Sequence, residues 1–175
     1  MQRNKSRNWF RLFWDSLRIY SNVKVIKGNK RVFLSYLLGR LFNRLQPTNE
    51  LYLIRYKDLL FWARLNEIPS ALLTWEQYEL NKWFIPNIKD GIVIDVGANI
   101  GGYTVRACKY AEKIISIEPL PDVAKILERN VKLNCDQNKV IIINKAINNR
   151  KKRIQLYIPK EGTPLASFRK FSPEK

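Results

Sequence analysis

The sequence contains no histidine among its 175 residues. This absence excludes Ser-His-Asp and Cys-His nucleophilic catalysis, and it removes the imidazole ligands that many protein metal sites use. Any general base must therefore be Asp, Glu, Lys, Tyr or Cys. The sequence predicts no metal site, and it identifies no catalytic residue.

Cysteine is almost as scarce, since it occurs only at Cys108 and Cys135. The two positions are far apart in the sequence, and neither belongs to a CxxC pair. This spacing argues against a zinc site and against a disulfide framework.

Long apolar runs are also missing. No uninterrupted run reaches the roughly 18 residues of a transmembrane helix. The first 20 residues are basic, but they lack the apolar core and the small-residue cleavage site of a secretory signal. We therefore expect a cytoplasmic protein, with a peripheral position at the inner membrane surface as the alternative.

Acidic residues are few, with 15 Asp and Glu against 32 Lys and Arg, which gives a net charge of +17. Such a charge attracts polyanions: nucleic acid, anionic lipid headgroups or phosphorylated substrates. A solvated basic surface without a specific partner is an equally good interpretation. Hydrophobic residues make up 46% of the chain, which indicates a globular protein with room for one domain and an extension.

Residues 1–85 form a basic region that is predicted to be mainly helical. Apolar side chains recur there at helical spacing in two stripes. The first stripe contains Phe10, Phe13, Trp14 and Leu17, and the second contains Leu37, Leu38, Leu41, Phe42 and Leu45. Residues 52–63 fit a strand or a helix. Thr74 and Gln77 match a capping box at the start of another helix.

The apolar stripes of this region have two interpretations. They can pack on the domain that follows them, which is the commoner arrangement. Alternatively, a basic amphipathic surface with Trp9 and Trp14 can lie in a membrane interface.

Residues 86–175 have a different pattern, of the β-α-β-α-β type. The expected elements, in order, are a strand at 91–97, a helix at 100–111, a strand at 113–119, a helix at 122–134 and a strand at 139–147. The first strand is rich in β-branched residues, as a buried parallel strand should be. Residues 153–159 alternate like a half-exposed strand. This order predicts an α/β fold with a parallel sheet and right-handed crossovers.

The candidate site lies in the sequence VIDVGANIGGYT, where the first strand ends. Gly97 is placed where the chain leaves the sheet, and Gly101 and Gly102 are placed where the next helix begins. Glycine permits a close backbone approach and a positive φ, and the N–H groups at a helix N-terminus can hold an anion. In open α/β sheets, ligands bind at this end of the strands.

The spacing discriminates among possible ligands. Asn99 occupies the second glycine position of a G-x-G-x-x-G dinucleotide fingerprint, and no Lys with Ser or Thr follows the last glycine as in a Walker A loop. Asp95 would repel a phosphate but suits the ammonium of an amino-acid moiety. Glu118, at the end of the second strand, can accept hydrogen bonds from two ribose hydroxyls. The combination predicts S-adenosylmethionine.

Five segments then resemble the FkbM-type methyltransferase family: VIDVGANIGGYT, IISIEPLPD, LERNVKLN, VIIINKAINN and RIQLYIP. In that family the D-x-G-x-x-x-G loop holds the methionine part of the cofactor and the acid of the E-P pair holds the ribose. The cofactor-binding residues implied by the resemblance are Asp95, Gly97, Ala98, Asn99, Gly101, Glu118 and Pro119. Asn130 and Asn134 match the N-V-x-L-N segment, where we interpret Asn134 as a helix C-cap without a chemical role.

The resemblance implies a Rossmann-like class I methyltransferase three-layer sandwich with an N-terminal helical extension. It covers residues 90–160, and the sheet is partial, with about three to four strands. Family members continue with a strand carrying a D-x-E-G motif, which this sequence lacks. A truncated product, a fragment and a half that pairs with a second chain all remain open, and each leaves an exposed sheet edge.

The implied reaction is O-methylation of a glycan or of a small-molecule hydroxyl, and the basic N-terminal region fits a lipid-linked or phosphorylated acceptor. Two alternatives remain. One is a nucleic-acid-binding protein with a degenerate Rossmann half, although no RNP-like strand or zinc finger supports it. The other is an inactive remnant that interacts through its N-terminal region.

Overall fold

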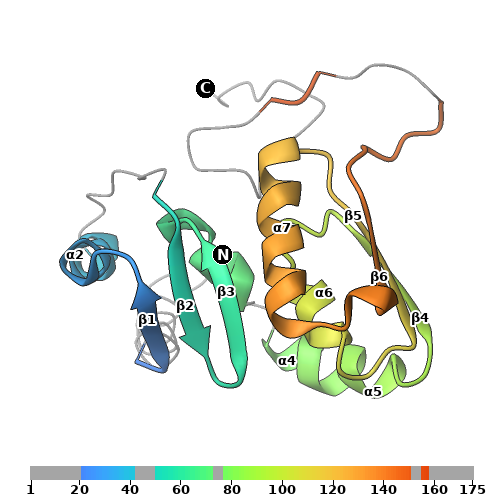
Figure 1. The fold of residues 1–175 in the computed structure, drawn as a ribbon, viewed down its shortest axis with the longest axis horizontal. Helices are drawn as coiled ribbons and strands as arrows, with labels where there is room; N and C mark the ends of the chain where they lie inside the picture. Colours follow the sequence, from blue (N-terminus) through green and yellow to red (C-terminus); the bar gives the residue numbers. More distant parts are fainter. Residues whose placement is uncertain (1–20, 42–49, 73–76, 151–154, 158–175) are drawn as a thin grey trace, which may run out of the picture.

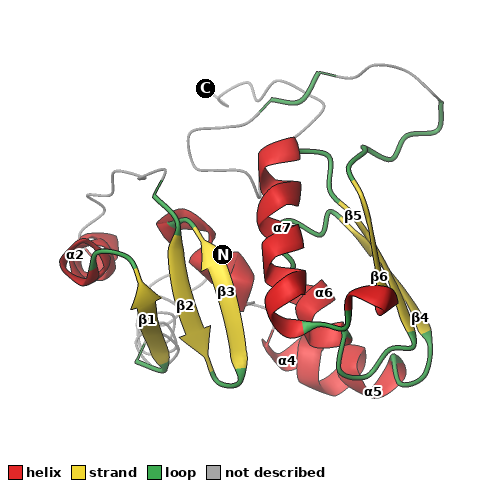
Figure 2. Cartoon of the chain, in the orientation of Figure 1, coloured by secondary structure: helices red, strands yellow, loops and turns green. Residues whose placement is uncertain are grey.

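The computed structural model describes residues 21–41, 50–72, 77–150 and 155–157. In this part of the chain, two three-stranded sheets lie on either side of helices α6 and α7 (Figure 1). One sheet is antiparallel and the other is parallel. Figure 2 shows the same arrangement by secondary structure, with the helical layer between the two groups of strands.

The antiparallel sheet has the order β1-β2-β3, with strands Val23–Lys27, Tyr52–Tyr56 and Leu59–Ala63. Helix α2, Lys30–Leu41, connects the first two strands. Every second residue of β2 is buried, which is the alternation of a strand that packs one face on a core. β2 and β3 form a hairpin whose turn places Lys57 at φ +56°.

The expectation that residues 1–85 are mainly helical therefore misses a complete sheet. Residues 52–63, which fitted either state, are the hairpin. The helical segments described after it are η1 (Leu65–Glu67), α3 (Ile68–Leu72), α4 (Gln77–Glu79), the π-helical η2 (Leu80–Phe84) and α5 (Ile85–Asn87). The stripe at residues 10–17 lies outside the described residues, as do Phe42, Leu45 and Thr74. A domain boundary after residue 85 stays a prediction.

The parallel sheet confirms the predicted α/β pattern. Its elements are β4 (Ile92–Val96), α6 (Gly102–Ala107), β5 (Lys113–Ile117), α7 (Pro121–Asn134), η3 (Gln137–Lys139) and β6 (Val140–Ile143). The strand order is β4-β5-β6, with all three strands parallel. This is the connected strand-helix-strand arrangement of one half of a Rossmann-like domain. Of residues 153–159, the structure describes 155–157, where Tyr157 forms a single bridge.

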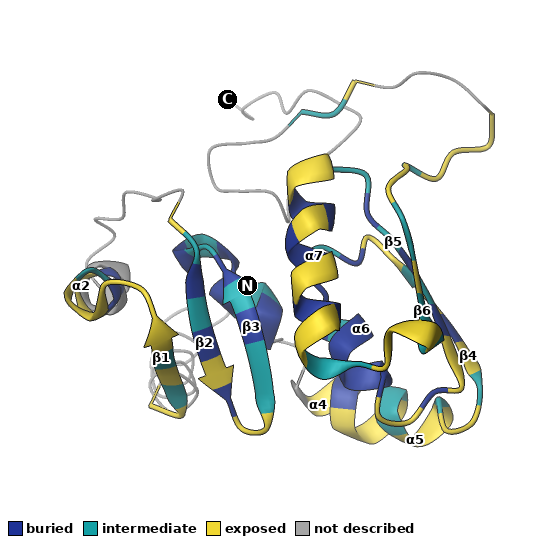
Figure 3. Cartoon of the chain, viewed as in Figure 1, coloured by how far each residue is buried: buried dark blue, intermediate teal, exposed yellow. Residues whose placement is uncertain are grey.

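One face of the parallel sheet is uncovered. Ile92, Ile94 and Val96 of β4 are 67%, 62% and 61% exposed, whereas Val93 on the opposite face is buried (Figure 3). The expectation that β4 is a strand buried on both faces is therefore wrong. Within the described residues, the sheet has a helical layer on one side only, so the three-layer sandwich is present in part.

Helix α7 joins the two sheets through two asparagine side chains. The Asn130 amide accepts from the backbone N–H of Trp62 and donates to its carbonyl, at 2.6 and 3.0 Å. Asn134 does the same at Leu60, at 2.9 and 2.7 Å. Four residues along a helix and two along a strand span nearly equal lengths, so the two amides replace the missing neighbour strand of β3. The interpretation of Asn134 as a C-cap is wrong, since Cys135 occupies that position.

Cys108 and Cys135 form a disulfide, with their Cα atoms 5.5 Å apart. The expectation that their spacing argues against a disulfide is therefore wrong. Helices α6 and α7 both end at the edge of the sheet where β5 and β6 begin, and this brings together two positions that are 27 residues apart. None of the described helices is long and apolar enough to cross a membrane.

Candidate functional site

The glycine loop between β4 and α6, residues 97–101, is tied to the end of the neighbouring strand. The backbone N–H groups of Gly97 and Ala98 both donate to the carbonyl of Ile117, at 2.9 and 3.0 Å. The N–H of Gly101 donates to the carbonyl of Ala98 at 2.9 Å. The loop therefore stands beside Glu118, as expected for the carboxyl ends of adjacent parallel strands.

Glu118 is a buried carboxylate at the centre of this edge, with 5% of its surface exposed. Its two oxygens accept from the backbone N–H groups of Asn99 and Leu120, each at 2.9 Å. Burial raises its pKa above the ordinary value, the two N–H donors oppose that shift, and the charge of Asp95 adds to it. The last contribution shows that the two predicted acids lie close enough for their charges to interact.

Asp95 accepts hydrogen bonds from the first turn of helix α6. Its Oδ2 accepts from the N–H of Thr104 at 3.1 Å and from its hydroxyl at 2.6 Å. The same hydroxyl lies 2.7 Å from the Ser116 hydroxyl. Burial raises the pKa of Asp95, and the two Thr104 bonds counteract the rise. The predicted ammonium contact would have to use Oδ1, which accepts no hydrogen bond from the described residues.

Asn99 stands out in the loop for its backbone conformation and for an unpaired side-chain oxygen. It adopts a left-handed conformation, with φ +52°, and its Oδ1 is buried without a hydrogen-bond partner in the described structure. Buried polar atoms are rarely left unpaired, so this oxygen is an exception among the described residues. The backbone N–H of Asn99 holds the loop against Glu118.

The two loop glycines with positive φ differ in their surroundings. Gly97, at φ +78°, is exposed, and a Cβ there would meet nothing within 4 Å. Gly101, at φ +94°, is buried, and a Cβ would lie 2.7 Å from Cδ1 of Leu127. Gly97 therefore leaves room for a ligand, whereas Gly101 lets α6 approach α7.

The remaining predicted residues support the loop. Ala98 is buried against Leu127 and Val131. Gly102 is the buried first residue of α6, and Pro119 is half-buried directly after Glu118. Among the described residues, no group of three or more Cys, Asp or Glu could hold a metal ion.

Sequence reasoning missed three residues whose side chains support Asp95 and Glu118: Thr104, Ser116 and Asn144. Asn144 donates from Nδ2 to the Glu118 carbonyl at 2.7 Å. Thr104 had a usable signal, because a hydroxyl in the first turn of the helix after the loop can reach the acid of the preceding strand. The described residues also line a cavity of about 480 Å³, which lies near the disulfide. None of the predicted cofactor-binding residues lines this cavity.

Comparison with protein-family models finds no match, and neither does comparison with curated protein sequences. Several solved structures resemble part of the chain. The M. jannaschii tRNA m1G37 methyltransferase is 20% identical, with a TM-score of 0.42 over 62% of this chain and 34% of that one. Trm5b from Pyrococcus abyssi is 17% identical, with a TM-score of 0.39 over 53% and 27%.

A third structure, precorrin 8w decarboxylase from Methanobacterium thermoautotrophicum, is 19% identical, with a TM-score of 0.33 over 40% of this chain and 38% of that one. The chain thus spans between about a quarter and two fifths of the length of these three proteins. The names of two of them state different activities, a tRNA methyltransferase and a decarboxylase. Likeness of this extent is a partial similarity of fold and does not bear on activity.

Proposed function

We propose that the glycine loop and the carboxyl ends of β4 and β5 form a crevice that binds S-adenosylmethionine, and that the protein belongs to a methyl-transfer system. Glu118 carries this proposal, because two backbone N–H groups hold its carboxylate beside the glycine loop, at the ends of adjacent parallel strands where ligands bind. The open space at Gly97 lets a ligand approach the backbone of the loop.

The residues present fit the chemistry of that cofactor. A ribose offers two hydroxyl donors, which suit the Glu118 carboxylate, and an ammonium offers N–H donors, which suit Oδ1 of Asp95. The acidic crevice also suits a sulfonium cation better than a phosphate. Because both Glu118 oxygens already accept a backbone N–H, the carboxylate is held in place before the ligand arrives.

When bound, S-adenosylmethionine would supply a methyl group that is already activated for displacement by an acceptor. The chain's contribution is therefore to bind and orient. Glu118 would fix the sugar, and the loop from Gly97 to Asn99 would fix the neighbouring part of the ligand. Orientation of this kind is worth about 7–11 kcal/mol in favourable cases. No side chain of the described crevice is assigned as a general base.

The finer assignments rest on the sequence. The FkbM-type resemblance supports a hydroxyl acceptor on a glycan or a small molecule. The net charge of +17 supports contact with an anionic membrane surface. A cytoplasmic position stays a prediction. Flotation with anionic vesicles at low salt tests the membrane contact, because a protein that stays with the soluble fraction does not bind them.

Calorimetric titration of the full chain with S-adenosylhomocysteine tests cofactor binding. Glu118→Gln removes a charged acceptor, and a charge-assisted hydrogen bond is worth about 1.5–3 kcal/mol. We expect binding to weaken by about ten- to hundredfold. Glu112→Gln makes the same charge change at an exposed position next to β5 and should leave the affinity unchanged.

Two results would reject the assignment. One is the absence of binding to the unmodified chain, and the other is equal affinity in the Glu118→Gln and Glu112→Gln variants. Binding without methyl transfer to any hydroxyl acceptor would keep the cofactor site and reject the acceptor class.

A further inference from the structure

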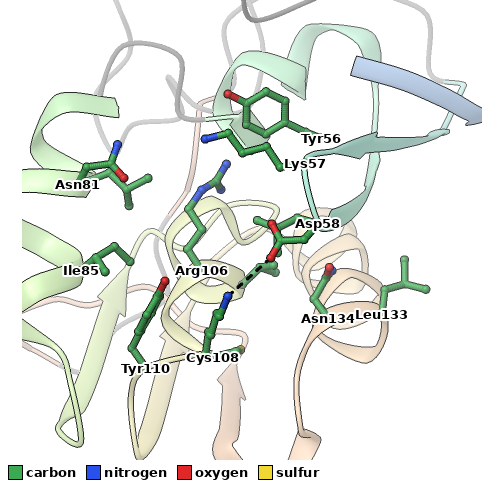
Figure 4. A pocket seen from close by; sticks show the side chains of 14 residues that line it. Tyr56, Lys57, Asp58, Asn81, Ile85, Arg106, Cys108, Tyr110, Leu133 and Asn134 are labelled. Carbon is green, nitrogen blue, oxygen red and sulfur yellow. Dashed lines mark ion pairs between the residues drawn. The ribbon is translucent and has the colours of Figure 1, made fainter. Parts of the chain in front are cut away.

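The cavity of about 480 Å³ lies apart from the crevice. It is bounded by the β2–β3 turn, by the helical segment from α4 to α5 and by the ends of α6 and α7 (Figure 4). Its volume is in the range of small-molecule sites. Since α6 begins at the glycine loop and ends at this cavity, the two lie at opposite ends of the same helix.

Arg106 is the most unusual residue of the cavity wall. It is only 8% exposed, and the centre of its guanidinium lies 5.6 Å from the centre of the Phe61 ring. Its Nη1 donates to the carbonyls of Ala71 and Gly102, at 2.9 and 2.6 Å, and its Nη2 donates to the carbonyl of Leu72 at 3.3 Å. No carboxylate of the described residues forms an ion pair with it.

The guanidinium thus has N–H groups that donate to none of the described residues. Of its five N–H groups, three are used, and the Nε–H and the second Nη2–H donate to none of the described residues. An Nε–H together with an Nη2–H is the fork with which arginine binds two oxygens of a phosphate or a carboxylate. Burial lowers the pKa of Arg106 to about 10, so it stays charged at neutral pH.

The charges around this fork are mostly positive. Lys57 and Lys109 line the cavity with Arg106, against the single acid Asp58. Asp58 lies 4.0 Å from Lys109, and both side chains are about 70% exposed, so this pair is weak. Figure 4 shows Lys57 and Asp58 on the hairpin turn, facing the end of α6 that carries Arg106. A buried cation without a bonded acid, under two lysines, favours a doubly charged anion.

We propose that this cavity binds the phosphate group of a small phosphate monoester, with Arg106 as the bidentate ligand and Lys57 and Lys109 at the mouth. The volume leaves room for the organic part, which would contact the ring of Tyr110 and the side chains of Asn81 and Ile85. The site does not depend on the proposed cofactor. It assigns a second ligand to a different edge of the fold.

Titration of the full, isotope-labelled chain with inorganic phosphate tests this site by NMR, with ionic strength held constant by sodium chloride. We expect saturable shifts of the Arg106 Nε–H signal and of the backbone amides of Lys57 and Lys109. The double variant Lys57→Gln/Lys109→Gln, which changes only exposed side chains, should weaken phosphate binding by about tenfold.

The matched control is Lys125→Gln/Lys132→Gln, which removes the same charge from exposed positions of α7 outside the cavity. It should bind phosphate as the unmodified chain does. Equal weakening in both double variants would show attraction by net charge alone and overturn the proposal. So would shifts that never saturate, or an Arg106 Nε–H signal that phosphate does not move.

Discussion

Truncating Asn130 should test whether helix α7 holds the two sheets together. This side chain is fully buried and makes three hydrogen bonds to the backbone of other elements. Two go to Trp62 of β3, and the third runs from Nδ2 to the Ile100 carbonyl at 2.8 Å. Asn130→Ala removes all three and leaves one N–H and two carbonyls without those partners.

The expected cost follows from these contacts. A typical hydrogen bond contributes about 0.5–1.5 kcal/mol net, and a buried group left unpaired costs more. Three bonds therefore give a loss of about 3 kcal/mol in the free energy of unfolding. That is a large share of the roughly 5–15 kcal/mol that stabilises a typical domain. Asn134→Ala should cost less, because Asn134 is only half-buried, whereas Asn130 is fully buried.

Urea unfolding followed by far-UV circular dichroism measures the difference. Arg129→Ala is the control, because Arg129 is the exposed neighbour on the same helix and its truncation should stay within about 0.5 kcal/mol. The account of α7 as the connecting element would be refuted if the free energy of unfolding of Asn130→Ala lay within about 1 kcal/mol of this control, which is the contribution of about one typical hydrogen bond.

Three further predictions concern the loop, the disulfide and pH. Gly101→Ala should lower stability by about 2–3 kcal/mol in urea unfolding, because the new Cβ is both strained and crowded, whereas Gly97→Ala should cost about 1 kcal/mol and weaken cofactor binding more. Replacing Cys108 and Cys135 by serine should lower the melting temperature by about 10 °C. The reason is that closing this loop restricts the unfolded chain and thereby stabilises the folded state by about 3 kcal/mol. An unchanged melting temperature would contradict this prediction. Burial raises the pKa of Glu118. Between the pKa of the unfolded chain, about 4.3, and this raised pKa, the folded chain keeps a proton that the unfolded chain has released. The free energy of unfolding should therefore fall as the pH rises through this interval. Glu118→Gln should flatten that slope in unfolding curves measured across this range.

Hydrophobic periodicity was sufficient to predict the parallel half of the fold. Alternating burial in β5 and the apolar stripe of α7 both follow from the sequence pattern. The placement of Glu118 beside the glycine loop follows from the same order, because consecutive parallel strands end at one edge.

Several features of the structure could not be predicted from the sequence pattern. The run of β-branched residues in β4 fits a strand buried on one face or on two, so the exposure of Ile94 could not be read from it. The hairpin turn uses Lys57 at positive φ, where glycine or asparagine is the usual marker. Arg106 has the sequence context of a surface residue on a helix, and only the carbonyls of α3, distant in sequence, reveal that it is buried.

The Asn130 amide has a consequence for the two candidate ligand sites. Its Nδ2 donates to Trp62 in the hairpin and to Ile100 in the glycine loop, so one side chain spans the elements that border the cavity and the crevice. A ligand that shifts the hairpin would therefore strain or relax the loop through a single rigid bridge. Thermodynamic linkage requires such an effect to be mutual, so phosphate should change the affinity for S-adenosylhomocysteine by the same factor as the reverse experiment.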